Sequence, residues 1–143
     1  MSSYKQVLIA VDLSDDSTRV VERGLEIAAH HGAKASLLHV IEFIPVDPTG
    51  EALLPPPVDL EDEMVNSARS RLDALSAQFA GRLEPRLEVG IIKLEILRVA
   101  AESNADLIVL GSHERHGLAL LLGSTEKAIL HKTHCDVLAV HLG

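Results

Sequence analysis

The fold of this chain is decided by the stretch Asp106-Leu107-Ile108-Val109-Leu110-Gly111-Ser112-His113-Glu114-Arg115-His116-Gly117. Its first part, Asp106–Leu110, is an aliphatic run of the kind that forms a buried strand. The segment that follows is glycine-rich and reaches Gly123-Ser124, after which Thr125–Lys132 has the pattern of a helix. A glycine-rich turn between strand and helix lets backbone N–H groups approach an anion, and the helix N-terminus adds partial positive charge. This pattern is typical of a phosphate-binding turn in a small nucleotide-binding α/β protein.

Four other segments have the composition of strands. Val7–Val11 and Lys34–Glu42 contain continuous apolar runs, which predict strands buried on both faces. Arg86–Ile92 alternates apolar and polar residues, as expected at a sheet edge, and Val137–Leu142 predicts the last strand. With the fourth strand, placed at Ala105–Leu110, these segments make five strands.

Helical patterns fill the connections between the strands. Ser14 is expected to cap the first helix, with Asp15 and Asp16 in its first turn, and Gly32 is expected to end it. The other predicted helices are Asp59–Phe79, Lys93–Ser103 and Thr125–Lys132. Phe43–Val58 carries most of the prolines and predicts a long loop, either a lid or an ordinary surface excursion. Alternating strands and helices predict a single α/β domain over 1–143, with a five-stranded parallel sheet and helices on both faces.

Composition restricts the classes of partner. The chain has 143 residues, of which 47% are hydrophobic, and its only aromatic residues are Tyr4, Phe43 and Phe79, so we expect an aliphatic core. The formal net charge of −8, from 13 basic and 21 acidic residues, disfavours binding to nucleic acid or to an anionic membrane. No segment approaches the roughly 18 apolar residues of a membrane span, and the first residues lack a signal-peptide pattern. We therefore expect a cytoplasmic protein.

Three candidate site residues stand at the ends of predicted strands. Asp12, Val40 and Gly111 lie at or near the carboxyl ends of three parallel strands. Ligands of such sheets bind beyond these ends, near the point where the strand order reverses. The residues are therefore expected to converge on one site. An aspartate at a strand end can also cap the turn that follows it, but the convergent position favours contact of Asp12 with a ligand.

These residues resemble the universal stress protein family (UspA-type) over essentially the whole chain. The matching blocks are Val7–Asp12, Leu37–Val40, Ala105–His113, Gly123-Ser124 and Cys135–Val140. The resemblance implies a Rossmann-like fold with strand order 3-2-1-4-5, a homodimer paired through the last strand, and a non-enzymatic role in stress survival. Many members bind ATP or a related adenine nucleotide. For this chain it implies that Asp12 and the Val40 backbone hold the adenosine. The expected cofactor-binding residues are Asp12, Val40, Gly111, His113, Gly117, Gly123, Ser124 and Thr125.

Glu114 departs from the family's phosphate loop, which reads Gly-x2-Gly-x9-Gly-(Ser/Thr). It replaces the second glycine, and eight residues rather than nine separate it from Gly123. A carboxylate about 4 Å from a phosphate costs roughly 4 kcal/mol at a partly screened surface, which is about a thousandfold in affinity. The cost is avoided if Glu114 turns to solvent, if Mg²⁺ bridges it to the phosphates, or if Arg115 and His116 offset it. Gly117 can also replace the missing glycine.

Two alternatives to a nucleotide-binding regulator remain. Members that have lost the loop glycines form a branch taken not to bind ATP, so the chain can be a nucleotide-independent stress protein acting through its dimer surface. A nucleotide-hydrolysing enzyme is less favoured, because the sequence shows no nucleophile–base pair and no P-loop lysine. The strand Val137–Leu142 contains no lysine or proline to protect a sheet edge, which independently favours a two-fold dimer through it.

The histidines and the cysteine can be explained by structural roles, without a metal or a redox function. His113-x-x-His116 and His131-x-x-His134-Cys135 have metal-like spacing, but a helix C-terminus accounts for the second group and we expect no bound metal. Cys135 is expected to be a small buried hydrophobe. His39, inside a strand, is expected to be packed and hydrogen-bonded.

Overall fold

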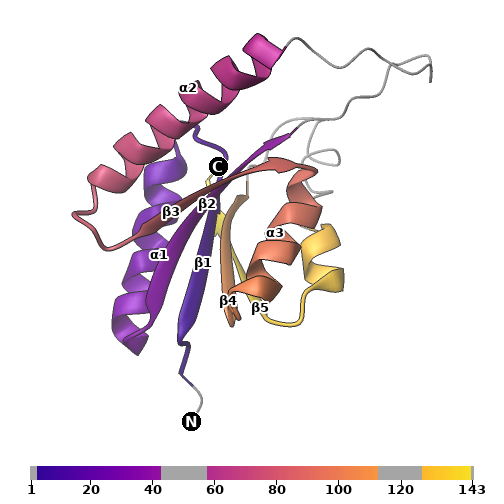
Figure 1. The fold of residues 1–143 in the computed structure, drawn as a ribbon. Coiled ribbons are helices and arrows are strands. Elements are labelled where there is room, and N and C mark those ends of the chain that lie inside the picture. The colour runs from indigo at the N-terminus through magenta and orange to yellow at the C-terminus, as the bar shows by residue number, and fades with distance from the viewer. Residues whose placement is uncertain (1–2, 43–57, 113–126, 143) are drawn as a thin grey trace.

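A computed structural model describes residues 3–42, 58–112 and 127–142. Figure 1 shows its strands and helices in a layered arrangement. In chain order they are β1 (Gln6–Val11), α1 (Ser17–His31), β2 (Lys34–Glu42), α2 (Val58–Ala77), β3 (Glu84–Gly90), α3 (Ile92–Glu102), β4 (Leu107–Ser112) and β5 (Asp136–His141). Residues 127–132, between β4 and β5, are also helical. No helix in these described ranges is long and apolar enough to span a membrane.

The five strands form one parallel sheet in the order β3-β2-β1-β4-β5, which confirms the predicted topology. β1 is the central strand, and Ala10 on it lies opposite Leu38 of β2 and Leu110 of β4. The order reverses at β1, because β2 and β3 lie on one side of it and β4 and β5 on the other.

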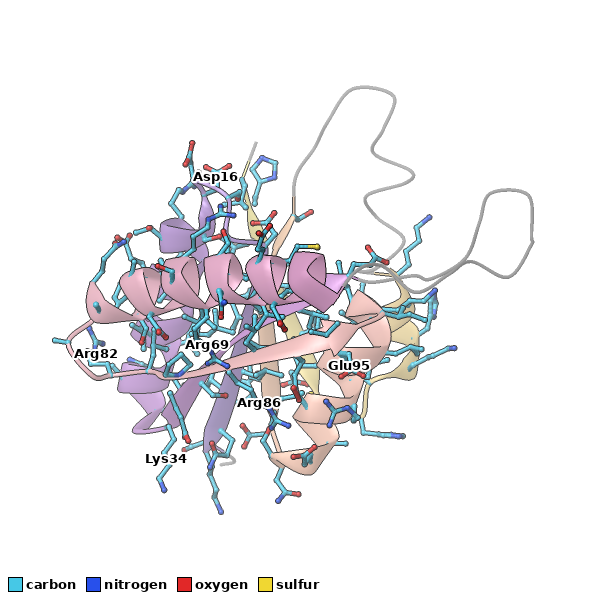
Figure 2. The ribbon with its side chains drawn as sticks, turned by 45° about the horizontal axis from the view of Figure 1, so that its top comes forward. Asp16, Lys34, Arg69, Arg82, Arg86 and Glu95 are labelled. Carbon is cyan, nitrogen blue, oxygen red and sulfur yellow. The ribbon has the colours of Figure 1, made fainter. Side chains whose placement is uncertain are left out.

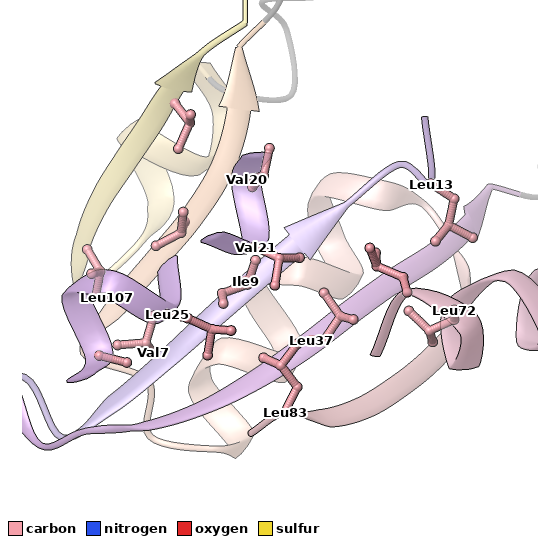
Figure 3. Close-up of a cluster of buried hydrophobic side chains, with 14 of the residues drawn as sticks. Val7, Ile9, Leu13, Val20, Val21, Leu25, Leu37, Leu72, Leu83 and Leu107 are labelled. Atoms are coloured by element: carbon pink, nitrogen blue, oxygen red, sulfur yellow. The ribbon is translucent and has the colours of Figure 1, made fainter. Parts of the chain in front are cut away.

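Two apolar clusters bury the two faces of the sheet. α1 and α2 cover one face, and α3 and residues 127–132 cover the other (Figure 1). Neighbouring residues of β1 point to opposite faces, as the two-residue repeat of a strand requires: Val7 and Ile9 join the first cluster, and Leu8 and Ala10 the second. Figure 3 shows the first cluster, in which β1 and β2 pack against α1 and α2.

The start of α1 differs from the sequence expectation. The helix begins at Ser17, Asp16 is its N-cap residue, and its first turn contains no acidic side chain. Ser14 is therefore not the cap: it lies in the preceding turn, where its carbonyl oxygen accepts a hydrogen bond from the Ser17 N–H at 3.0 Å. The predicted end at Gly32 is confirmed, since this glycine is left-handed with φ 66°.

Strand pairing moves several other boundaries. β3 begins two residues before the predicted Arg86 because Glu84 already pairs with Ser36 of β2. β4 extends past the predicted end at Leu110, since Gly111 and Ser112 still pair with Val140 and His141 of β5. The loop predicted at Phe43–Val58 lies outside the described residues except for Val58, which begins α2.

Ion pairs join the edge strand β3 to α3. The Arg98 guanidinium on α3 lies 2.7 Å from Glu88 of β3, 2.7 Å from Glu95 and 2.9 Å from Glu102. Arg86 of β3 contacts Glu88 at 3.2 Å and Glu102 at 3.1 Å. Figure 2 labels Arg86 and Glu95 on the outer surface of this region. The network connects two adjacent elements through partly exposed side chains.

Candidate functional site

A cavity of about 350 Å³ lies at the carboxyl ends of β1, β2 and β4. Its lining includes Asp12, which directly follows β1, together with Val40 of β2 and Gly111 of β4, so the structure brings together the three residues that the sequence placed at strand ends. The cavity lies beside β1, where the strand order reverses, and this is where open parallel sheets bind ligands. Its volume lies within the range of about 300–1,000 Å³ found for small-molecule sites.

The walls of the cavity are mainly apolar. α1 contributes Val20, α3 contributes Ile92 and Ile96, and Leu142 closes the side next to β5. The sequence reasoning missed these wall residues. Ile92 and Ile96 are four residues apart on one helix face, a pattern that could have indicated an inward side but not which cavity it bounds. An apolar cavity with a few polar groups at its rim suits a flat, weakly polar molecule.

The carboxylate of Asp12 organises the turn after β1. Its Oδ1 accepts one hydrogen bond from the Ser14 N–H at 2.9 Å and another from the Ser17 hydroxyl at 3.3 Å. Ser17 is buried, with 3% of its surface exposed, whereas Asp12 is exposed at the cavity. The turn-capping interpretation of Asp12 is therefore confirmed. Its contact with a ligand stays a prediction.

His39 fixes the end of β1 from the neighbouring strand. Its Nδ1 lies 2.9 Å from the carbonyl oxygen of Val11. Because a carbonyl oxygen only accepts, Nδ1 carries the hydrogen and donates in this contact. The ring is half-buried, so the hydrogen-bonded role expected for His39 is confirmed.

Close packing around Gly111 leaves no space for a side chain at this position. It lies within β4 rather than in the turn after it, contrary to the boundary expected from sequence. A Cβ atom placed on it would lie 2.6 Å from Cδ1 of Leu142 and 3.1 Å from Cγ2 of Val20. Both contacts are closer than ordinary packing allows. The absence of a side chain therefore lets Leu142 and Val20 close over β4 at the cavity wall.

The predicted phosphate loop lies outside the described residues. This applies to Glu114 and to five of the expected cofactor-binding residues, which are His113, Gly117, Gly123, Ser124 and Thr125. Their contribution to the site stays a prediction from sequence. The geometry above therefore concerns the end of the site where the expected adenosine contacts lie.

The described residues show no metal cluster around His131 and His134. His131 and His134 are exposed, and within the described ranges no three His, Cys, Asp or Glu side chains gather as a metal site would require. The expected burial of Cys135 is only partly met. It is half-buried against the second apolar cluster, with Sγ 3.2 Å from the Thr133 hydroxyl oxygen.

The sheet order and the cavity at its reversal define a doubly wound α/β protein. The model of the universal stress protein family matches residues 3–141, and the chain belongs to this family. It is 42% identical over 139 residues to universal stress protein A homolog 1 of Coxiella burnetii, and the match covers 96% of each chain.

Solved structures agree on the fold. Hypothetical protein MJ0577 superposes with a TM-score of 0.80 at 23% identity, over 99% of both chains. A universal stress protein solved in complex with cAMP superposes with a TM-score of 0.62 at 28% identity, over 98% of both chains. The Rossmann-like architecture is thus shared along the whole length of the chain.

Proposed function

We propose that this protein binds an adenine nucleotide as a regulatory ligand in a stress response. The observation that carries the proposal is the apolar cavity at the reversal of the strand order, with Asp12 at its rim. Apolar walls suit an adenine ring, and a carboxylate suits the hydroxyl donors of a ribose. The cAMP complex of a relative that is 28% identical supports the same class of ligand.

Each part of the nucleotide has a proposed contact. The Asp12 carboxylate accepts a hydrogen bond from a ribose hydroxyl, and the backbone of Val40 binds the adenine. Backbone N–H groups from Gly111 onward through the sequence-predicted loop hold the phosphates. If Mg²⁺ accompanies the nucleotide, the Glu114 carboxylate would help to hold the ion, whose charge would offset that of the phosphates. The proposal includes no catalytic residue, places the protein in the cytoplasm, and pairs two copies through β5.

Glu114 favours one competing function. If its carboxylate faces the phosphates without a cation, the repulsion removes about a thousandfold in affinity. The protein would then act without a nucleotide, through the surface of its dimer. A measurement of bound nucleotide separates the two functions.

The first experiment examines the protein as purified. Denaturation followed by mass spectrometry identifies any released nucleotide, and calorimetry then measures ATP binding with and without Mg²⁺. In Asp12→Asn we expect about tenfold weaker binding, because a charge-assisted hydrogen bond to the ribose becomes a neutral one. Asp15→Asn changes an exposed carboxylate of the same turn and is the matched control, with unchanged affinity expected.

Two results would contradict parts of the proposal. The absence of released nucleotide, together with no heat at millimolar ATP, would contradict nucleotide binding and support the nucleotide-independent function. Equal weakening in both variants would contradict the contact proposed for Asp12, because it would assign the effect to general charge. In the first case Glu114→Gly tests whether removing the loop carboxylate restores binding.

A further inference from the structure

Leu13, the residue after Asp12, has an unusual backbone conformation. Its φ is 63°, in the left-handed region that a bulky side chain enters at a cost of roughly 1–2 kcal/mol. Its side chain is nevertheless buried, with 7% exposed, in the cluster that also contains Leu72 of α2. The local hydrogen bonds of Asp12 are therefore joined by packing against a distant element in holding this turn.

Side chains from two other elements bond the carbonyl groups on either side of Asp12. Arg71 of α2 donates from Nη2 to the carbonyl oxygen of Leu13, across 58 residues of sequence. His39 of β2 donates to the carbonyl oxygen of Val11 at 2.9 Å. A hydrogen bond from a guanidinium is charge-assisted and about twice as strong as a neutral one. The backbone that carries the Asp12 carboxylate is thus fixed at both ends.

We propose that Arg71 is a positioning residue for the ligand site. It does not line the cavity. Its bond to Leu13 stabilises the left-handed turn, and this turn sets the direction of the Asp12 carboxylate at the cavity rim. The ligand part of this inference rests on the proposed nucleotide function, while the effect on the turn does not.

The same contact makes α2 part of the site. Leu72, the next residue along, is fully buried in the first cluster, which also contains Leu13, so helix and turn share an apolar cluster as well as a hydrogen bond. A displacement of α2 would break the bond to Leu13 and release the turn. Affinity for the ligand therefore depends on a helix whose described side chains, from residue 62 onward, do not line the cavity.

Amide hydrogen exchange followed by NMR tests the effect on the turn without any nucleotide. In Arg71→Met we expect the Ser14 amide, which donates to Asp12, to exchange at least tenfold faster relative to the core amide of Ile9. Arg71→Lys restores a cationic donor and should recover much of the protection. Arg69→Met, at an exposed position of the same helix, is the control and should leave both amides unchanged.

Calorimetry with ATP tests the effect on the ligand. Arg71→Met should weaken binding about tenfold, and Arg69→Met should not. Equal behaviour of the two variants in exchange at Ser14 and in affinity would overturn the proposal, as would a parallel loss of protection at Ser14 and Ile9. If the wild-type protein binds no nucleotide while Arg71→Met selectively exposes Ser14, the proposed ligand is wrong and the positioning of Asp12 by Arg71 stands.

Discussion

At the scale of single residues, the turn after β1 is held by bonds that converge on it from several directions. Asp12 receives hydrogen bonds from Ser14 and Ser17, and Leu13 receives one from Arg71. The Ser14 hydroxyl is buried and has no hydrogen-bond partner among the described residues. Two serines three positions apart therefore have different roles in the same turn.

This difference gives a prediction that separates the two serines. Ser17→Ala should reduce the free energy of unfolding by about 1 kcal/mol, because it removes a buried hydroxyl bonded to Asp12. Ser14→Ala should change it by less than about 0.5 kcal/mol, whereas a true helix cap would cost about 1 kcal/mol. Urea unfolding of both variants measures the values. A larger loss in Ser14→Ala than in Ser17→Ala would contradict this account of the turn.

The sequence could indicate Asp12 as a candidate but not the residues that hold it. A carboxylate at the end of an apolar strand is visible in the sequence, and so is the convergence of three strand ends. The hydrogen bond from Arg71 to Leu13 joins residues 58 positions apart in the sequence. The periodicity of apolar residues cannot indicate a contact between two such distant positions. Because serine is a common N-cap residue, the sequence predicts Ser14 as the helix cap, whereas the structure starts the helix at Ser17.

At the scale of secondary structure elements, ion pairs attach the edge strand β3 to α3. Arg98 and Arg86 hold Glu88 between them, and they connect this strand to α3. The hydrogen bond from Arg98 is the largest cause that lowers the pKa of Glu88 from its ordinary value of 4.5, with Arg86 adding to it and burial opposing it. Because the folded pKa is lowered, ionised Glu88 stabilises the fold above about pH 4.5. That contribution is lost as the pH falls through the folded pKa.

Glu88→Gln should therefore change how stability depends on pH. We expect it to lower the free energy of unfolding by about 0.5–1 kcal/mol at pH 7, with the difference from wild type shrinking as the pH falls from 5 to 3. The side chain of Glu88 is 23% exposed, whereas that of Glu26, paired with Arg23, is 70% exposed. Glu26→Gln is the control, with no measurable change expected. A constant difference for Glu88→Gln at every pH would show that its charge is not responsible.

Element types were predictable, whereas their ends were not. The continuous apolar run of β1 and the amphipathic pattern of α2 reflect which side chains are buried. Burial determines the spacing of apolar residues, and that spacing is visible in the sequence. The ends depend on partner strands: Gly111 and Ser112 belong to β4 because β5 pairs with them. The order of the strands came from the family resemblance, and the topology confirms it.

At the scale of the whole molecule, the two edges of the sheet differ. β3 has the ion-pair network at its side, while β5 carries the apolar residues Val137, Leu138 and Ala139. Ala139 is exposed there, and β5 contains no lysine or proline. An unprotected apolar edge invites pairing with another strand. This asymmetry supports the proposed homodimer through β5.

Ala139→Lys should shift the protein from dimer to monomer. Two copies paired about a two-fold axis would place the new lysines close together at the edge, where they repel and oppose strand addition. Sedimentation velocity at micromolar concentration measures the mass. Ala101→Lys, at an exposed position on α3, is the control and should remain dimeric. A monomeric wild-type protein, or a dimeric Ala139→Lys variant, would contradict dimerisation through β5.

The contact between Leu142 and Gly111 has a practical consequence for handling the protein. Leu142 forms part of the cavity wall, and its N–H donates to the Ser112 carbonyl oxygen at 2.9 Å. In Figure 1 the chain enters β1 at one end of the sheet, and β5 runs toward the other end, where Leu142 lines the cavity. A purification tag fused after residue 143 would therefore follow a residue of the cavity wall almost directly. A polyhistidine tag there would bring metal-binding imidazoles close to the cavity, so binding studies should use a tag at the N-terminus.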